Sequence, residues 1–151
     1  MTLDIRLLGS DDDQVLTRVA DGVFDHAVDP SLAREFLADA RHHMIVAIDG
    51  GVVVGMISAL HYVHPDKAAQ LWINEVGVAP SYHRRGIARQ LLDAMLAHGH
   101  ALGCTEAWLG TEDTNGAANA LYRSTGGKPE PFVLYSWELD ASGGAAGDDG
   151  A

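Results

Sequence analysis

A short basic turn contains the first residues of the chain whose types and spacing predict chemistry. The turn covers residues 82–88, which are Tyr82, His83, Arg84, Arg85, Gly86, Ile87 and Ala88. The first N–H groups of a helix have no partner within the helix and lie at the positive end of its dipole, so they bind anions. Gly86 and the small Ala88 would let a diphosphate approach the backbone. By itself the turn is more typical of a solvated helix start, and it lacks the glycine patterns of nucleotide- and dinucleotide-binding loops.

A second helical pattern carries an Asn and a Tyr that would face the same way. Asn115 and Tyr122 are seven residues apart, and seven residues make about two helical turns, so both side chains project to one side. The pattern follows a β-rich run and lies about thirty residues beyond the basic turn. The occurrence of both segments in one chain is much less expected by chance than the occurrence of either alone.

Glu75 lies in the β-rich run that precedes the basic turn. Strict alternation predicts one face with Ile73, Glu75 and Gly77 and another with Trp72, Asn74 and Val76. A glycine is unfavourable inside a strand and often marks a bulge or a close backbone approach. Gly77 therefore predicts a bulge or a close backbone approach near the end of this run.

The elements that must position these residues show either the two-residue periodicity of a strand or the 3.6-residue periodicity of a helix. Strands are expected over 2–8, 44–48, 52–60, 70–78, 104–110 and 132–139, and helices over 12–24, 32–40, 86–102 and 115–124. Asp49-Gly50-Gly51 predicts a tight hairpin, because glycine tolerates the positive φ of such turns. One domain is expected over residues 1–140, followed by a disordered, acidic, Gly/Ala-rich tail over 141–151.

Composition narrows the class of protein. The chain has 151 residues, 47% of them apolar, and a formal net charge of −11. Because a phosphate backbone needs a cationic face, nucleic acid is not an expected partner, and no apolar run is long enough to predict a membrane span. The single Cys104 and the absence of a leader pattern predict a cytoplasmic location. The eight histidines lack metal-site spacing, so no metal is expected.

The two motifs, in this order, resemble those of the GNAT superfamily of acyl-CoA-dependent acyltransferases. That family shows Gln/Arg-x-x-Gly-x-Gly/Ala at the pyrophosphate turn and Asn-x-x-Ala-x-x-Leu-Tyr-x-x-x-Gly in the following helix. The resemblance covers residues 2–139, and His83 stands where the family has Gln or Arg. It implies an α/β (α+β) GNAT fold with a mixed, mostly antiparallel sheet of six to seven strands and helices on both faces. The implied order of elements is β-α-α-β-β-β-α-β-α-β.

The resemblance also implies acetyl-CoA as co-substrate and a possible homodimer. Its implied cofactor-binding residues are Val76, Gly77, Val78, His83, Arg84, Arg85, Gly86, Ile87, Ala88, Asn115 and Tyr122. The implied catalytic residues are Glu75, as general base for the amine, and Tyr122, as donor to the departing sulfur. A surface carboxylate and a packed ring remain the alternatives for these two residues.

The sequence indicates the acceptor less specifically than the co-substrate. The chain further resembles the short GNAT-type aminoglycoside 3-N-acetyltransferases in length, in Leu8-Gly9, in residues 13–15 and 52–55, and in the acid before Val-x-Val. That resemblance implies a small cationic amine, most simply an aminoglycoside antibiotic. Carboxylates that would bind it are Asp25, Asp29, Glu75, Glu112, Asp113 and Glu138. Two alternatives are another amine (a polyamine, an amino acid or a protein N-terminus) and a non-catalytic acetyl-CoA-binding module.

Overall fold

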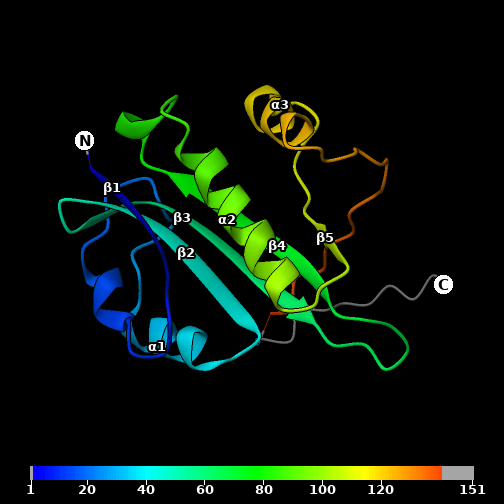
Figure 1. The fold of residues 1–151 in the computed structure, drawn as a ribbon, viewed down its shortest axis with the longest axis horizontal. Helices are drawn as coiled ribbons and strands as arrows, with labels where there is room; N and C mark the ends of the chain where they lie inside the picture. The colour runs from blue at the N-terminus through cyan, green and yellow to red at the C-terminus, as the bar shows by residue number, and fades with distance from the viewer. Residues whose placement is uncertain (1, 141–151) are drawn as a thin grey trace.

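A five-stranded mixed sheet forms the frame of the molecule (Figure 1). The computed structural model describes residues 2–140, so the tail predicted over 141–151 lies outside the described residues. The strands are β1 (Leu3–Leu7), β2 (His42–Asp49), β3 (Val52–Tyr62), β4 (Gln70–Val78) and β5 (Glu106–Trp108). They lie in the order β1-β2-β3-β4-β5, with β1 to β4 antiparallel and β5 parallel to β4. The expected mixed, mostly antiparallel sheet is confirmed.

Helical segments lie on both faces of this sheet, as expected. The longer ones are α1 (Pro30–Ala38), α2 (Ile87–Ala101) and α3 (Gly116–Ser124), and the short 3-10 segments are η1 (Asp13–Thr17) and η2 (Pro80–Tyr82). α2 crosses the front of the sheet in Figure 1, and α3 lies at the top of the view, above β5. α2 covers an apolar core that includes Ile57, Leu71 and Met95. η1 and α1 cover a second core on the other face, around Val46 and Met56.

The β2–β3 hairpin follows directly from its sequence. β-branched and other apolar residues fill both strands, and Val53 to Ala59 are all buried because both faces of β3 are covered. Gly50 and Gly51 form the turn with φ of 57° and 80°. Such a pair of positive φ angles suits a two-residue hairpin, so the predicted turn is confirmed.

The helix predicted over residues 12–24 is wrong. Only Asp13–Thr17 is helical, as a 3-10 turn. The next residues leave the helix because they pair with the start of β3: the Val53 amide donates to the Arg18 carbonyl, and the Ala20 amide donates to the Val53 carbonyl. Leu16 and Val23 are still buried, so the apolar positions were identified while their backbone conformation was not.

The strand predicted over 132–139 is also wrong. Its alternating pattern is present, but a strand needs a partner for its backbone groups. Residues 126–140 join no strand of the sheet, and six large apolar side chains there are exposed: Phe132, Val133, Leu134, Tyr135, Trp137 and Leu139. The described sheet therefore has five strands in place of the expected six to seven. The observed order of elements ends at α3.

β4 contains a β-bulge at Asn74. Ser58 of β3 pairs with Glu75, whereas the next residue, Ala59, pairs with Ile73. Asn74 is therefore the extra residue, and one extra residue reverses the alternation of the strand beyond it.

The bulge decides which side of the sheet each later residue faces. Ile73 lies in the core under α2, and Val76 packs against the same core. Glu75 therefore faces the opposite side, which is the side that Trp72 also faces. The predicted division of β4 into two strictly alternating faces is wrong, and the bulge lies at Asn74 instead of Gly77.

β4 and β5 separate after a short parallel pairing. The paired positions are Gln70 with Glu106, Leu71 with Ala107 and Trp72 with Trp108. β4 continues to Val78, so residues 73–78 have β3 on one side and no described strand on the other. The strand expected over 104–110 is thus much shorter, and the sheet is split at its β4 edge.

No helix in residues 2–140 has the length and apolar content that crossing a membrane requires.

Three histidines form a hydrogen-bonded chain that joins β2, β3 and α2. His43 Nε2 lies 2.8 Å from His61 Nδ1, and His98 Nε2 lies 3.0 Å from His43 Nδ1. His43 is buried, and burial lowers its pKa to about 4, with further lowering by His98, His61 and His42 and an opposing effect of Asp39. Burial also lowers the pKa of His98. The neutral form of His43 is therefore the one that the folded chain contains near pH 7.

Acid should weaken the fold through His43. The unfolded chain binds this proton near pH 6.5 and the folded chain only near pH 4. The contribution of His43 to stability is therefore fully present above about pH 6.5 and is lost as the pH falls towards 4. We expect urea denaturation to give a free energy of unfolding about 1 to 2 kcal/mol lower at pH 5 than at pH 7.5. His43→Gln should remove most of this slope, and the exposed His26→Gln should retain it; equal slopes in all three proteins would contradict the assignment.

Candidate active site

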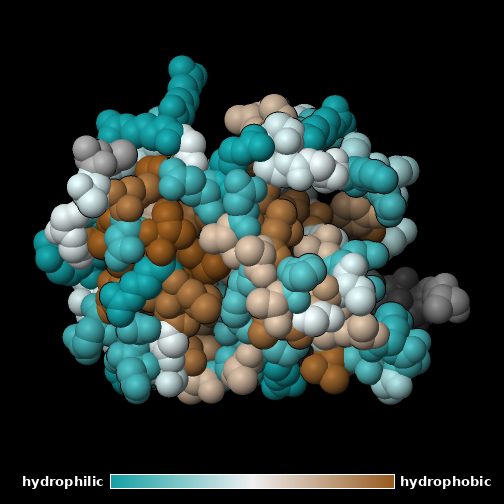
Figure 2. Space-filling model, in the orientation of Figure 1, coloured by the Kyte–Doolittle hydropathy of each residue, from teal (hydrophilic) through white to brown (hydrophobic). Residues whose placement is uncertain are grey.

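The split between β4 and β5 opens into a cavity of about 730 Å³. Its walls come from four places: β4, the turn after β4, residues 109–111 and α3, with residues 22–25 closing one side. Figure 2 shows the surface hollowed beneath α3, with apolar residues at the opening. The cavity thus follows the open edge of β4.

The turn after β4 presents an uncapped helix start to this cavity. Gly86 is the N-cap of α2 with φ 75° and ψ 13°, and no side chain caps the helix. Arg84 also has a positive φ of 64°, which is uncommon for a residue with a Cβ. His83, Arg84 and Ala88 line the cavity, and nothing lies within 4 Å of the place where a Cβ would be on Gly86. The start of α2 at the cavity therefore has no side-chain cap, and it is the place where the sequence predicts anion binding.

Other members of the predicted turn have different positions. Ile87 is buried in the core under α2, so only its backbone belongs to the turn. The Arg85 guanidinium lies 5.0 Å from the centre of the Tyr82 ring. Tyr82 lines the cavity and donates a 2.5 Å hydrogen bond to Asp49, which raises the pKa of the tyrosine. Tyr82 is the first residue of the predicted turn, and it lines the cavity although the family motif itself begins at His83.

His83 ties the turn to the end of β4. Its Nε2 lies 2.8 Å from the Val78 carbonyl oxygen and donates to it. Because a strand alternates, the backbone groups of Val76 point to the same open edge and those of Gly77 point to β3. The open edge of β4 therefore has unpaired backbone groups at Val76, while the carbonyl of Val78 is already bonded.

Position 77 requires a glycine for a steric reason. A Cβ on it would lie 2.1 Å from the carbonyl oxygen of Val23. The close backbone approach predicted at this position is real, but the approaching backbone belongs to the chain itself. Gly77 thereby lets residues 22–25 close over the side of the cavity.

α3 supplies the opposite wall through the predicted Asn and Tyr. Asn115 caps the helix by accepting from the Ala118 amide at 3.2 Å. Asn115 and Tyr122 both line the cavity, which confirms that they face the same side. Tyr122 is half-buried, and burial raises its pKa. The phenol is therefore protonated near neutral pH and can donate a hydrogen bond.

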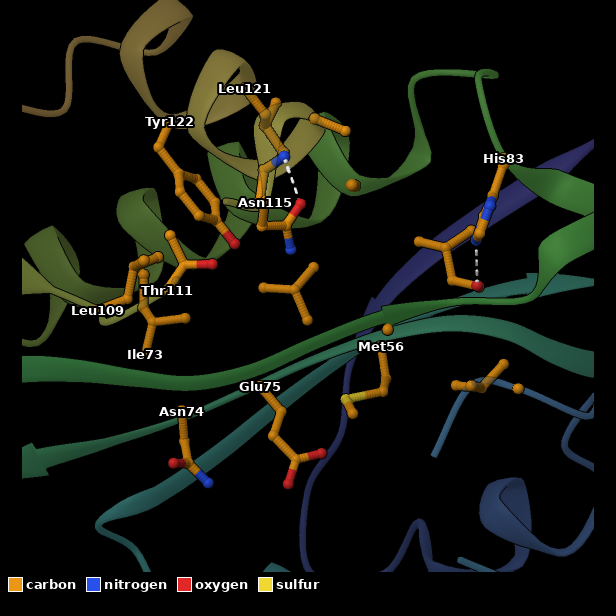
Figure 3. Close-up of a pocket in the computed structure, with 18 of the residues that line it drawn as sticks. Met56, Ile73, Asn74, Glu75, His83, Leu109, Thr111, Asn115, Leu121 and Tyr122 are labelled. Atoms are coloured by element: carbon orange, nitrogen blue, oxygen red, sulfur yellow. Dashed lines mark hydrogen bonds between the residues drawn. The ribbon is translucent and has the colours of Figure 1, made fainter. Parts of the chain in front are cut away.

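Glu75 and Tyr122 lie on opposite sides of the β4 edge. Figure 3 shows Tyr122 and Asn115 on the α3 side and Glu75 and Asn74 on the other side. Glu75 is exposed, and its carboxylate has no ion pair with a described residue. The cavity therefore offers a phenol to one side of the edge and a carboxylate to the other.

The remaining predicted acids are scattered. Asp25 lines the cavity. Asp29 does not, because its carboxylate caps α1 by accepting from the Ser31 and Leu32 amides. Glu112, Asp113 and Glu138 are exposed and lie outside the lining. The lining residues that sequence analysis did not single out include Met56, Asn74, Leu109 and Thr111, which only the bulge and the split bring together.

Among residues 2–140, no three His, Cys, Asp or Glu side chains are grouped so that they could hold a metal ion.

Comparisons with known proteins give the family. Residues 14–126 match the model of the acetyltransferase (GNAT) family. N-alpha-acetyltransferase RimI of Mycobacterium tuberculosis is 36% identical over 101 residues, which are 64% of this chain and 59% of that protein. An uncharacterized N-acetyltransferase of the same species is 30% identical over 94 residues, 62% of this chain and 58% of that protein. The chain thus spans less than two thirds of the length of these curated relatives.

Solved structures share the fold over most of the chain. An aminoglycoside acetyltransferase from a soil metagenome, in complex with trehalose, has a TM-score of 0.80 and 20% identity and covers 91% of this chain and 97% of its own. AAC(6')-Iy, in complex with a bisubstrate analog, has a TM-score of 0.75 and 21% identity over 91% and 99%. A ribosomal-protein-alanine N-acetyltransferase of Brucella melitensis has a TM-score of 0.70 and 18% identity over 91% and 100%. At these identities the likeness shows the fold alone.

Gly77→Ala should disturb this site more than its size suggests. The added methyl group must displace the Val23 carbonyl, so we expect a loss of about 2 to 3 kcal/mol in the free energy of unfolding. Gly116→Ala is the matched control, because nothing lies within 4 Å of its added carbon and alanine favours the first turn of α3. Thermal unfolding followed by circular dichroism measures both; equal melting temperatures would show that Gly77 is not needed for this packing.

Proposed function

Because the chain belongs to the acetyltransferase (GNAT) family, we propose that it transfers an acetyl group from acetyl-CoA to a primary amine of a small cationic acceptor. An aminoglycoside is the acceptor that we favour. The observation that carries the proposal is one cavity that contains an uncapped helix start, an open strand edge, a half-buried phenol and an exposed carboxylate. The cavity extends to both sides of the β4 edge, which supports direct attack with both substrates bound together.

The residues of the cavity fit acetyl-CoA. The start of α2, which no side chain caps, suits the diphosphate together with Gly86 and Ala88, and Arg84 adds positive charge. The open backbone groups of Val76 would bind the extended arm as a strand partner would, beside the α3 wall with Asn115. When bound, acetyl-CoA supplies an activated acetyl group and a thiolate leaving group.

Tyr122 would assist the departing thiolate. Its phenol is protonated near neutral pH because burial raises its pKa, and no hydrogen-bond partner of its hydroxyl is found among the described residues. A free thiol has a pKa near 8.5, so the required help is small and lies within the range of acid catalysis.

Glu75 would act on the amine. A protonated amine cannot attack, so its proton must pass to a base, either directly or through a water molecule. Glu75 lies on the side of β4 opposite Tyr122, and Asp25 also lines the cavity. Two carboxylates in the lining favour a cationic acceptor, and the formal net charge of −11 would attract one over longer range.

A protein N-terminus is the second candidate acceptor. The observation that favours it is the 36% identity to the N-alpha-acetyltransferase RimI of Mycobacterium tuberculosis. We favour the aminoglycoside because of the acidic residues at the site and because of the sequence resemblance. The 3-amino position remains a prediction from the sequence, since the similar enzyme with a position in its name, AAC(6')-Iy, is of the 6' type.

A panel assay tests the proposed function. Thiol release from acetyl-CoA would be measured with kanamycin A, spermidine, free amino acids and a peptide with an N-terminal alanine. We expect the largest kcat/KM with kanamycin A. Preference for the peptide would replace the aminoglycoside by a protein N-terminus, and tight acetyl-CoA binding without turnover on any amine would indicate a non-catalytic binding module.

Ala88→Asp should weaken cofactor binding without harming the fold. Ala88 lies in the first turn of α2 and lines the cavity. A carboxylate there is favourable to the helix dipole but repels a diphosphate, so we expect the Kd for CoA in calorimetry to rise about tenfold or more. Ala97→Asp, on the exposed side of α2, is the control and should leave the Kd unchanged. Equal affinity of both variants would rule out this turn as the diphosphate site.

Two variants separate the catalytic roles in the same assay. Tyr122→Phe should lower kcat about 100-fold and leave the Kd for CoA unchanged, because only the donor is lost. Glu75→Gln should lower kcat/KM and leave the Kd for CoA unchanged. Tyr135→Phe is the control, since this ring is 72% exposed and lies outside the cavity. Full rate in Tyr122→Phe, or an unchanged kcat/KM in Glu75→Gln, would end the respective assignment.

A further inference from the structure

Three aromatic rings stand side by side across the open end of the sheet. They come from three adjacent strands: Tyr62 ends β3, Trp72 lies in β4 and Trp108 ends β5. The rings of Tyr62 and Trp72 are 6.1 Å apart and inclined by 17°, and those of Trp72 and Trp108 are 5.2 Å apart and inclined by 14°. We call these three residues the aromatic ladder. Such nearly parallel stacking fixes the rings in a row.

The ladder lies on the same side of the sheet as Glu75. The neighbours of Trp72 in β4, Leu71 and Ile73, are buried under α2, so Trp72 faces the other side. The bulge at Asn74 brings Glu75 to that side as well. At the usual rise of a strand, Trp72 and Glu75 are roughly 10 Å apart along β4.

This side of the sheet is open at the ladder. Tyr62 is 38% and Trp108 is 43% exposed. The three rings themselves do not line the cavity, but Gly110, two residues beyond Trp108, does. The ladder is thus an exposed aromatic surface whose β5 member lies close in sequence to the cavity lining.

Carboxylates stand at both ends of this surface. Glu106 precedes Trp108 by two residues, so both side chains leave β5 on the same side. Glu106 and Glu75 are exposed and have no ion pair with a described residue. Aromatic faces between unpaired carboxylates match a molecule with apolar ring faces and several ammonium groups.

We propose that the aromatic ladder is an acceptor subsite that stacks a second ring of an amino sugar, with Glu106 binding one of its ammonium groups. The proposal rests on the proposed function, because it places the reacting amine at Glu75 and the non-reacting ring on Trp108. It names the acceptor class as an amino sugar of two or more rings. A single amino sugar held at Glu75 would not reach the ladder.

The test compares two acceptors that differ in length. The kcat/KM for kanamycin A, which has several rings, and for glucosamine, which has one, would be measured in Trp108→Ala and Trp108→Phe. In Trp108→Ala we expect kcat/KM for kanamycin A to fall about tenfold through KM, with glucosamine changed less than about twofold. Trp108→Phe should recover most of the loss, because a phenyl ring still stacks. Trp137→Ala, which is 77% exposed and outside the ladder, is the control and should change neither acceptor.

Several results would overturn the subsite. One is an unchanged kcat/KM for kanamycin A in Trp108→Ala, and another is an equal fall in kcat/KM for kanamycin A and glucosamine. A third is an equal fall in kcat/KM for spermidine, a linear polyamine without rings. Circular dichroism checks that the variants fold. If Trp108→Ala does not fold, Trp108→Phe keeps the test informative.

Calorimetry separates this proposal from the proposed function. Kanamycin A would be titrated into the native protein and Trp108→Ala with CoA present, which needs no turnover. Weaker binding to Trp108→Ala would support the subsite even if the native protein acetylated no amine. Acetylation of kanamycin A with identical binding to both proteins would support the proposed function and overturn the subsite.

Discussion

The separation of β4 from β5 is the constraint on which the rest of the site depends. Two parallel strands that stayed paired would satisfy each other's backbone groups and leave no room between them. Here the pairing stops at Trp72 and Trp108, and β4 continues alone to Val78. An edge strand with free amides and carbonyls is a template for another extended chain. The cavity, its walls and its open backbone groups all follow from this one separation.

The bulge at Asn74 gives this edge two chemically different sides. Without the extra residue, Glu75 would point into the core under α2, where an unpaired carboxylate would be costly. With it, Val76 fills that core and Glu75 joins the open side. The absence of a side chain at Gly77 then allows the Val23 carbonyl to approach and close the site. A local irregularity of one residue thus separates a phenol from a carboxylate across a strand edge.

The charges of the molecule suit a site for an anionic and a cationic substrate. A basic turn in an acidic chain favours anion binding at the start of α2, where the helix dipole adds to it. Glu75 lies on the side of β4 opposite Tyr122, and Asp25 also lines the cavity. The proposed anionic and cationic substrates would therefore be attracted to different parts of the cavity.

The sequence by itself determined the local elements and the two motifs. β4, the hairpin at Gly50-Gly51, α2 and α3 follow from periodicity and turn residues, and the shared direction of Asn115 and Tyr122 follows from helix geometry. These features depend on residues close in sequence, so one sequence is enough to predict them.

Only the tertiary structure decided the rest, because the rest depends on partners distant in sequence. Residues 18–20 leave a helical path because they pair with β3, and residues 132–139 form no strand because none of the five strands pairs with them. The role of Asp29 as a helix cap, the place of the bulge and the row of Tyr62, Trp72 and Trp108 likewise depend on how separate segments meet. Periodicity describes a segment, whereas register and separation belong to pairs of segments.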